Sequence, residues 1–374
     1  MKIGFSTFVL DGGQTGVATY IRELLRHLQM EDAENRYNLL MARRDADLVP
    51  LSNPNFSKTV VPDLLGRPLP NLLWHNAALP LAGKKHDLLH IPSARRIPLV
   101  KRTKVVATVH DLAAFSIEGK YDPARMLFNR RLVPAMIRRA DHVIAVSEAT
   151  KRDVIRHARY PEGQVSVIHS GINHDLFRPV DPETARERLL VHHGLEKPFL
   201  VYVSRLEHPA KNHVRLIEAF ERFKLENDSA HQLVLAGADW HGAATIKARA
   251  AESPVADDIR FLGFVPGKSL PLLYSACDLM VFPSLFEGFG FPPIEALACG
   301  ARVVCSGTSA MQEIAAGHIL TFDPTRAETI HHAIETALSA DWTLENRASG
   351  MDYALQFNWR KTARNVMEIY RSLA

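Results

Sequence analysis

The feature that most constrains this chain is the alternation of short apolar segments with longer amphipathic ones. Segments such as 105–109 (VVATV) and 279–282 (LMVF) carry apolar residues on both faces of an extended strand. Strands of this kind are typical of parallel sheets that helices cover on both sides. Helical patterns such as 17–28 and 214–223 separate the strand segments along the chain. The alternation therefore predicts an α/β protein with parallel sheets.

The strand segments form two series, with a break at 171–179 and a linker at 179–182 (PVDP). A length of 374 residues also fits two domains of about 150–190 residues better than one. We predict two doubly wound, Rossmann-like domains of about six strands each, at 1–178 and 179–355. A terminal helix at 356–374 could return to the first domain. The predicted strands are 2–9, 37–41, 87–91, 104–109, 142–146 and 165–168, then 199–204, 232–236, 259–262, 278–282, 302–305 and 319–322. The other predicted helices are 124–139 and 327–338.

Composition narrows the class of protein. The residues are 47% apolar and 23% charged, as in ordinary globular proteins, and three cysteines without a CxxC pair support neither a disulfide framework nor structural zinc. The first ten residues suit a buried strand better than a signal peptide, and no run of 18 apolar residues is present. We therefore expect a cytoplasmic protein without a membrane span.

Charge is distributed unevenly along the chain. Residues 1–180 carry 26 Lys and Arg against 17 Asp and Glu, whereas the remainder carries 19 against 24. Such asymmetry indicates that the first half faces an anionic partner, although solvated loops and helix ends would explain it equally well. No aromatic residues are interleaved with the basic clusters, so nucleic acid is not the expected partner.

A glycine-rich turn, DGGQTG at 11–16, follows the first strand and precedes a helix. Glycines there allow backbone amides to approach an anion at the start of a helix, although a tight strand–helix turn is an equally good explanation. The spacing is neither GxGxxG nor GxxxxGK[ST], which disfavours a dehydrogenase and a P-loop enzyme.

The most informative segment is 282–300, which contains EGFGFPPIEALACG. It starts at the carboxyl end of a predicted strand, where open α/β sheets bind ligands. Glu287 lies in the loop and Glu295 on the helix that follows. Two carboxylates beside a glycine-rich helix entrance suit a polyhydroxylated ligand that carries phosphate, because carboxylates accept hydrogen bonds from hydroxyls and free amides receive phosphate oxygens.

With this segment the chain resembles the retaining glycosyltransferases of family 4, which have the GT-B fold, and among them the bacterial mannosyltransferases of O-antigen and exopolysaccharide synthesis. The resemblance covers most of the chain. Further matching motifs are the GGxxG turn, VHDL at 109–112, ADHVIAVS at 140–147, IHSGIN at 168–173, YVSRL at 202–206 with Lys211, and LAG at 235–237. Asn212 and Ser204 stand where the family more commonly has glycine.

The resemblance implies two domains that face a central cleft, with the nucleotide-sugar held mostly by the second. Arg205 and Lys211 would bind the diphosphate, Glu295 the ribose hydroxyls and Glu287 the hydroxyls of the transferred sugar. His110 and Glu287 are the expected catalytic residues, with His110 beside the reacting sugar. The remaining expected donor-binding residues are Gly13, Gly16, Phe264, Gly288, Phe289, Gly290 and Phe291.

The family also implies retention by a same-face displacement without a covalent enzyme intermediate. We expect no metal and no cofactor. The Asp45-x-Asp47 pattern is interpreted as a solvated loop. The adjacent pairs His192-His193 and His331-His332 lack metal-ligand spacing.

The donor and acceptor rest on the resemblance alone. It suggests GDP-mannose as the donor, with UDP-glucose and UDP-N-acetylglucosamine as alternatives. A sugar-nucleotide 2-epimerase and a non-catalytic nucleotide-binding protein remain less favoured alternatives. The expected acceptor is a saccharide linked to polyprenyl diphosphate, and the expected location is the inner face of the cell membrane, bound peripherally through anionic lipids. The residues that would contact the membrane are Phe115, Leu127, Phe128 and Leu132, beside Arg125, Arg130 and Arg131; packing inside the domain would explain the apolar ones equally well.

Overall fold

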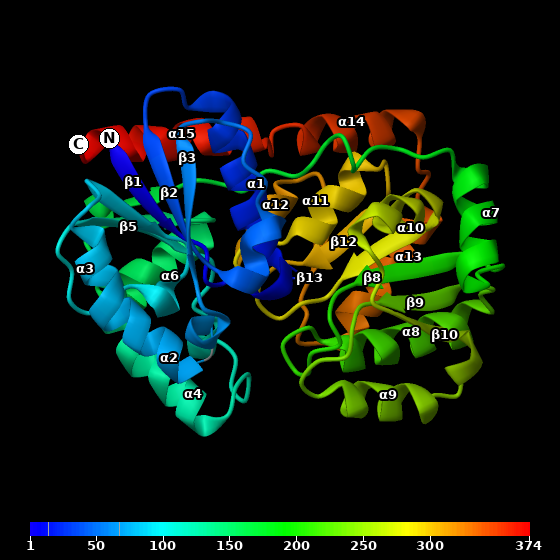
Figure 1. Ribbon diagram of the computed structural model, residues 1–374. Helices are drawn as coiled ribbons and strands as arrows, with labels where there is room; N and C mark the ends of the chain where they lie inside the picture. Colours follow the sequence, from blue (N-terminus) through cyan, green and yellow to red (C-terminus); the bar gives the residue numbers. More distant parts are fainter. Residues whose placement is uncertain (14, 67) are drawn as a thin grey trace. The chain divides into compact units, whose positions relative to one another are not determined.

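The computed structural model describes residues 1–13, 15–66 and 68–374 and divides into two compact units (Figure 1). The first contains residues 1–116, 121–171 and 358–374, and the second contains residues 117–120 and 172–357. The division thus falls a few residues before the predicted boundary at 178, and residues 358–374 group with the first unit.

The first unit is built on a parallel sheet, which has seven strands among the described residues, in the order β3-β2-β1-β4-β5-β6-β7. Every neighbouring pair is parallel. The order reverses direction between β1 and β4, which makes the carboxyl ends of these two strands a topological switch point. The strands are β1 (Lys2–Ser6), β2 (Arg36–Ala42), β3 (Phe56–Val61), β4 (Leu88–Ile91), β5 (Lys104–Val109), β6 (His142–Ala145) and β7 (Val165–Val167).

Strand β3 was not predicted, and the first sheet therefore has seven strands rather than six. Its sequence, FSKTVV, places polar residues at three consecutive positions, and only Phe56 and Val61 are buried. It lies at the edge of the sheet and pairs with β2 alone. Polar, partly exposed edge strands lack the apolar pattern that identifies central strands, because one edge and much of each face contact water.

Helices cover the first sheet: α1 (Gly16–Glu31), α2 (Pro68–Leu73), α3 (Leu79–Gly83), α4 (Pro123–Leu127), α5 (Val133–Ile137), α6 (Glu148–Ala158) and α15 (Trp359–Ser372). The single helix predicted at 124–139 is instead α4, a π-helical turn at Phe128–Leu132, and α5. Pro134 lacks the N–H that an α-helix would use at that position and its ring crowds the preceding turn, which favours the wider turn before it.

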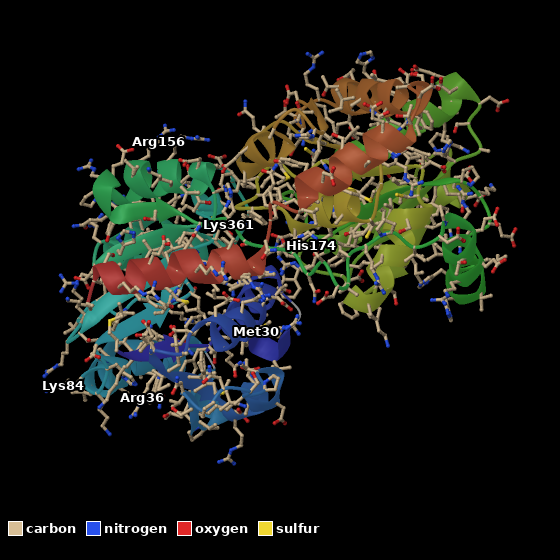
Figure 2. The ribbon with its side chains drawn as sticks, turned by 90° about the horizontal axis from the view of Figure 1, so that it is seen from above. Met30, Arg36, Lys84, Arg156, His174 and Lys361 are labelled. Carbon is tan, nitrogen blue, oxygen red and sulfur yellow. The ribbon has the colours of Figure 1, made fainter. Side chains whose placement is uncertain are left out.

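The C-terminal helix α15 is an integral part of the first unit. Figure 2 shows it beside α1, with the exposed Met30 and Lys361 marking the two helices. Arg360 and Arg364 of α15 both donate to Glu31 of α1, each at 2.7 Å. The amphipathic segment that no strand follows, α15, therefore packs within the first unit and does not belong to the second.

The second unit, all of whose residues are described, contains a six-stranded parallel sheet in the order β10-β9-β8-β11-β12-β13. Its switch point lies between β8 and β11. The strands are β8 (Phe199–Val203), β9 (Gln232–Ala236), β10 (Ile259–Gly263), β11 (Leu279–Phe282), β12 (Val303–Ser306) and β13 (Leu320–Phe322). The helices are α7 (Pro182–His193), α8 (His213–Asn227), α9 (Ala243–Ala251), α10 (Leu270–Ala276), α11 (Phe291–Ala298), α12 (Ala310–Ala315), α13 (Ala327–Ser339) and α14 (Leu344–Ala354).

All twelve predicted strands are present, with ends shifted by a few residues, and the doubly wound α/β fold is confirmed. Across the described ranges, none of the helices is both long enough and apolar enough to pass through a bilayer.

Candidate functional site

An ion pair lies at the switch point of the second sheet. The loop after β8 carries Lys211, and the loop after β11 carries Glu287. Since β8 and β11 are parallel neighbours, their carboxyl ends lie at the same edge of the sheet. The Lys211 Nζ donates to Glu287 Oε1 at 2.6 Å, and the two side chains are only 19% and 15% exposed. Two residues that are distant in sequence therefore form one partly buried, charged centre.

The backbone around Glu287 fixes where its carboxylate lies. The Glu287 N–H donates to the Ser309 hydroxyl at 2.9 Å, and Ser309 itself has a left-handed backbone with φ of 52°. Gly290 has φ of 95°, and a Cβ added there would lie 2.0 Å from Met311 Cε. The backbone angle therefore favours glycine at position 290, and any side chain there would also have to displace the end of Met311. Gly288 lies in the same loop, two residues before it.

Lys211 is held by the residue that follows it. Asn212 adopts φ of 60°, a conformation that glycine and, less often, asparagine take. Its side-chain amide donates to the carbonyls of Pro283 at 3.0 Å and Pro324 at 2.7 Å. Asparagine therefore supplies the backbone angle for which the family more commonly has glycine, and it also ties the Lys211 loop to the end of β11.

Arg205 has partners that the sequence did not indicate. Its guanidinium donates to Glu207 at 2.9 Å and lies over the ring of Trp240, 4.7 Å from the centroid. Glu207 is 5% exposed, whereas the Arg205 side chain is 41% exposed. Trp240 follows β9, next to β8, so the strand-end rule that identified Arg205 could also have identified Trp240. Arg205 is therefore a partly accessible cation held between a buried carboxylate and an aromatic face.

Glu295, on α11, is a carboxyl group in an unusual state. Burial raises its pKa to about 8, and the hydrogen bond from the Tyr274 hydroxyl, at 3.3 Å, opposes that rise. The group is therefore mostly protonated at neutral pH, whereas the sequence analysis treats it as a carboxylate. A carboxyl with such a shifted pKa in a sheet-end site is a strong candidate for ligand contact.

The aromatic residues expected at the site differ in exposure. Phe289 is buried and packs edge-to-face on Phe291 at 5.1 Å and on Phe357 at 5.9 Å. This packing supports the loop after β11, so the Phe289 side chain is a scaffold element rather than a surface for a ligand. Phe264, after β10, is 55% exposed and offers an accessible aromatic face.

In the first unit, His110 lies directly after β5. Its Nε2 lies 3.2 Å from the Pro92 carbonyl oxygen, and its ring meets that of Tyr20 edge-on at 4.8 Å. Burial lowers the pKa of His110 to about 4, while the Asp111 carboxylate acts in the opposite direction. The imidazole is therefore neutral at physiological pH and can act through hydrogen bonds but not as a cation.

The glycine turn precedes helix α1. Gly13 has φ of 83°, and Gly16 is the first residue of α1, capped by Thr15, whose hydroxyl accepts from the Ala18 N–H at 3.1 Å. The N–H of Gly12 donates to Asp45 Oδ1 at 3.1 Å.

The interpretation of Asp45-x-Asp47 as a solvated loop is wrong for Asp45. That residue is 1% exposed and fixes the glycine turn through the hydrogen bond from Gly12. The sequence distance between the two partners explains why neither segment predicts the contact.

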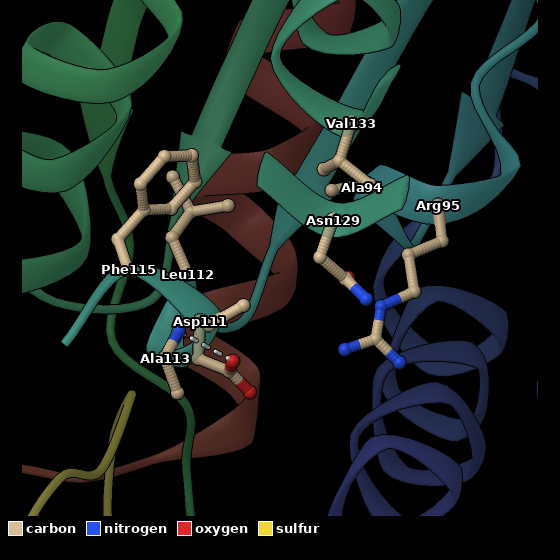
Figure 3. Close-up of a pocket in the computed structure, with 9 residues that line it drawn as sticks. Ala94, Arg95, Asp111, Leu112, Ala113, Phe115, Asn129 and Val133 are labelled. Carbon is tan, nitrogen blue, oxygen red and sulfur yellow. Dashed lines mark hydrogen bonds between the residues drawn. The ribbon is translucent and has the colours of Figure 1, made fainter. Parts of the chain in front are cut away.

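A small pocket opens beside the segment that follows His110 (Figure 3). Its polar lining comes from Arg95, Asp111 and Asn129, and its apolar lining includes Leu112 and Val133. The Asp111 carboxylate also accepts the Ala113 N–H at 3.0 Å. The pocket combines a guanidinium, a carboxylate and an amide, which are the groups that recognise sugar hydroxyls.

The two halves of the chain match two domain families. Residues 14–176 match Glycosyltransferase Family 4, and residues 186–354 match Glycosyl transferases group 1. The first match lies mainly in the first compact unit, and the second match lies entirely in the second.

Curated relatives carry related names. The chain is 26% identical to the O-antigen chain mannosyltransferase B of Escherichia coli, over the full length of both proteins. It is 30% identical to the serotype-specific mannosyltransferase WbdA of Escherichia coli. That match covers 72% of this chain and 34% of the longer relative.

Solved structures share the fold over the whole chain. Sucrose-phosphate synthase from Thermosynechococcus elongatus has a TM-score of 0.78 at 23% identity, with 100% of this chain and 99% of that chain covered. Anabaena Alr3699/HepE, solved in complex with UDP and glucose, has a TM-score of 0.79 at 20% identity, with both chains fully covered. Together with the sheet order and the two domain matches, these similarities show that the chain belongs to the GT-B glycosyltransferases of family 4.

Proposed function

We propose that this glycosyltransferase moves mannose from GDP-mannose to a saccharide acceptor with retention of anomeric configuration. The observation that carries the proposal is the Lys211–Glu287 pair at the switch point of the second sheet, with Arg205 after the same strand. A cation and a carboxylate at this edge match the two ends of a nucleotide-sugar, its diphosphate and its hydroxylated ring.

Each group has a separate task in this mechanism. Lys211 and Arg205 offset the charge that develops on the departing diphosphate, and Glu287 accepts hydrogen bonds from the hydroxyls of the sugar. Glu295 receives the ribose hydroxyls. The leaving phosphate takes the proton of the acceptor hydroxyl on the same face of the sugar, so no covalent enzyme intermediate forms. Neutral His110 donates or accepts a hydrogen bond beside the reacting sugar, and the reaction requires no metal.

The choice of GDP-mannose is supported by the names of the two relatives from Escherichia coli, one of which matches over its full length. UDP-sugars are the second candidate, because a protein with the same fold was solved with UDP and glucose. Thermal unfolding with GDP, UDP and ADP in separate samples decides between them, since a nucleotide that binds the folded state raises Tm. Stabilisation by GDP alone is expected, and stabilisation by UDP alone would overturn the proposed donor.

The acceptor side of the proposal rests on the pocket of the first unit. Arg95, Asp111 and Asn129 offer both donors and acceptors to a saccharide. Substitution of Asp111 by Asn should raise KM for the acceptor with little change in the affinity for GDP. An unchanged acceptor KM, measured with a mannose-containing oligosaccharide, would remove the pocket from this role.

We further propose that the acceptor is linked to polyprenyl diphosphate and that the first unit binds the anionic membrane surface that holds it. Leu127 and Leu132 are 63% and 40% exposed among the exposed residues Arg125, Arg130 and Arg131. The two aromatic residues predicted beside them are less suited, because Phe115 and Phe128 pack against the core of the unit. Flotation with vesicles of anionic lipid should recover the protein at low salt and lose it at high salt. Absence of binding at low salt would contradict the membrane proposal.

A further inference from the structure

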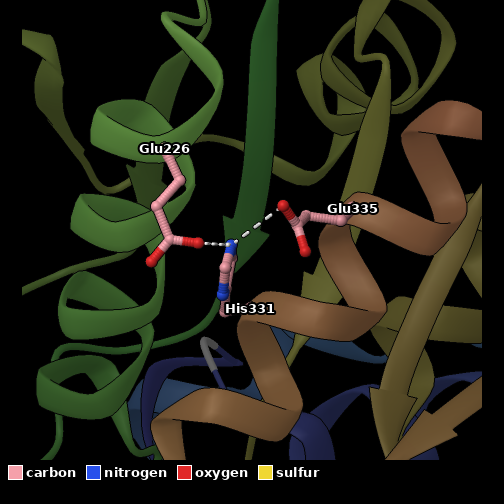
Figure 4. A group of neighbouring side chains, drawn as sticks. All are labelled: Glu226, His331 and Glu335. Atoms are coloured by element: carbon pink, nitrogen blue, oxygen red, sulfur yellow. Dashed lines mark ion pairs between the residues drawn. The ribbon is translucent and has the colours of Figure 1, made fainter.

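A cluster of three potential metal ligands lies on the second unit, on two packed helices (Figure 4). His331 and Glu335 are four residues apart on α13, and therefore share one face of the helix. Glu226 projects toward them from the last turn of α8. The His331 Nε2 lies 3.6 Å from Glu226 Oε2 and 3.3 Å from Glu335 Oε1.

His331 is the unusual member of the cluster. Its side chain is 10% exposed, and its buried Nε2 makes no hydrogen bond of good geometry among the described residues, although it lies within ion-pair distance of both carboxylates. A ring nitrogen that is buried without a hydrogen bond loses its contact with water and gains no protein hydrogen bond. Its burial therefore costs free energy. Figure 4 shows the two carboxylates on opposite sides of this nitrogen, one from each helix.

The distances match those between the ligands of one metal ion. Ligand atoms about 2.1 Å from a tetrahedral Zn²⁺ lie about 3.4 Å from one another. The two measured distances, 3.3 and 3.6 Å, bracket that value, and all three ligand atoms lie within 4.8 Å of each other. One imidazole nitrogen and two carboxylates form a donor set that binds Zn²⁺ and related divalent ions.

The surroundings orient the ligands. The Asn227 amide donates to Glu335 Oε1 at 2.9 Å, and this is the oxygen that faces His331. That hydrogen bond is the largest cause of a lowered pKa for Glu335, so the carboxylate is charged at neutral pH. Such second-shell contacts fix the direction of a metal ligand.

We propose that Glu226, His331 and Glu335 bind a divalent transition-metal ion, with Zn²⁺ the best match, and that this ion holds the end of α8 against α13. Water completes the coordination on the exposed side, where Glu226 is 60% exposed. The adjacent pair His331 and His332 lacks metal-ligand spacing, whereas the four-residue step from His331 to Glu335 places two ligands on one helix face.

The site is separate from the proposed donor site. Lys211 lies just before α8 and Glu226 near its other end, and a helix of 15 residues is about 22 Å long. The metal therefore stabilises the second unit, and the prediction that catalysis needs no metal is independent of it.

The test is calorimetric titration of ZnCl₂ into the full-length protein, freed of metal with a chelator, combined with thermal unfolding. The wild type should bind Zn²⁺ at this site and unfold at a higher temperature when it is bound. His331→Gln, or Glu226→Gln if the first variant folds poorly, should lower the affinity at least tenfold and abolish the rise in Tm. Asn227→Ala should weaken binding about tenfold by releasing Glu335.

Two substitutions on the same helix serve as controls. His332→Gln removes an exposed neighbouring imidazole, and Glu328→Gln breaks the 3.1 Å ion pair with Arg222 that also joins α8 to α13. Both should retain Zn²⁺ affinity. Equal Zn²⁺ affinity in the wild type and His331→Gln would overturn the proposal. A wild-type protein whose Tm does not rise with Zn²⁺ would also overturn it.

Discussion

The carboxyl edges of the two sheets have the same topology but differ in the charge of their candidate catalytic residues. In the second unit the loops that follow β8 and β11 contain paired charges, Lys211 with Glu287 and Arg205 with Glu207. In the first unit the corresponding edge carries the neutral imidazole of His110 beside the pocket lined by Arg95 and Asp111, and the N–H groups of Gly12 and Gly13 already donate to Asp45 and to the Leu10 carbonyl. The same fold has therefore produced one edge with ion-paired cations and another whose candidate catalytic residue, His110, is neutral.

The pairing of charges in the second unit has an energetic consequence. Each cation already has a carboxylate partner, so a diphosphate must share or replace that partner when it binds. The two cations also differ in accessibility, because Lys211 is 19% exposed and Arg205 is 41% exposed. Substitutions at the two edges should consequently separate charge effects from hydrogen-bond effects.

The largest effect is expected for Glu287→Gln. The amide keeps the size of the side chain but loses the charge that pairs with Lys211 and the acceptor strength needed by the sugar hydroxyls. We expect kcat to fall by about 10²–10³-fold, a typical loss for one preorganised electrostatic contact. Glu345→Gln, at an exposed position on α14, is the matched control. Transfer by Glu287→Gln at nearly the wild-type rate, with Tm unchanged, would remove this residue from the site.

Next in size is the effect of Arg205→Ala on nucleotide binding. The substitution removes a cation from the diphosphate and leaves the buried Glu207 without its partner, so affinity for GDP should fall by about 2 kcal/mol or more, roughly 30-fold. Calorimetry measures the loss. Arg205→Lys should recover part of it, because the charge remains but the planar contact with Trp240 does not. Identical Kd values in the wild type and Arg205→Ala would exclude a role in diphosphate binding.

The third prediction concerns pH and the shifted carboxyl of Glu295. Its pKa of about 8 means that a ligand which requires the carboxylate must displace a proton at neutral pH. Affinity for GDP-mannose should therefore rise by up to about tenfold per pH unit between pH 6 and 7.5 and level off above pH 8. The nucleotide-sugar is the suitable probe because its diphosphate carries no terminal group that titrates in this range.

The control for this pH dependence is Glu295→Gln, in which the slope should disappear. Folding stability provides a second measurement with the opposite sign. The folded state holds the proton more tightly than the unfolded state, whose pKa is near 4.5, so this group lowers stability as pH rises from about 4.5 to 8. An affinity that does not change with pH in the wild type would show that the carboxylate form is not needed.

The sequence predicted the fold because its determinants are local. Strands buried on both faces, such as β5 and β11, are recognisable from their own residues, and all but one of the described strands were predicted. The exception, β3, is an edge strand with polar residues at 57–59. The meeting of Lys211 with Glu287 also follows from the sequence, because parallel neighbouring strands bring the loops that follow them to one edge.

The sequence could not predict the contacts that depend on side-chain direction in turns. Asp45 is buried because one backbone N–H, that of Gly12, points at it from a distant segment. Glu207 pairs with Arg205 because the loop after β8 turns back on itself, with the Glu207 N–H bonded to the Arg205 carbonyl at 2.8 Å. The protonated state of Glu295 likewise depends on burial by residues that only the folded chain brings around it.

The smallest effects are expected for the neutral His110 of the first unit. Because burial lowers the pKa of His110 to about 4, its charge should not change between pH 6 and 8, and kcat should show no titration of this residue there. His110→Gln, which keeps a hydrogen-bonding group, should reduce kcat only several-fold, and less than His110→Ala.

The dependence of folding stability on pH in the acid range gives an independent measurement of the same group. In the unfolded chain His110 binds a proton near pH 6.5, whereas in the folded protein it binds one only near pH 4. The wild type therefore loses folding stability as pH falls through this interval, and His110→Gln should lose less. If activity instead falls with a midpoint near pH 6.5 in the wild type and not in His110→Gln, the imidazolium takes part in the reaction, and the contrast between the ion-paired residues of the second unit and a neutral His110 fails.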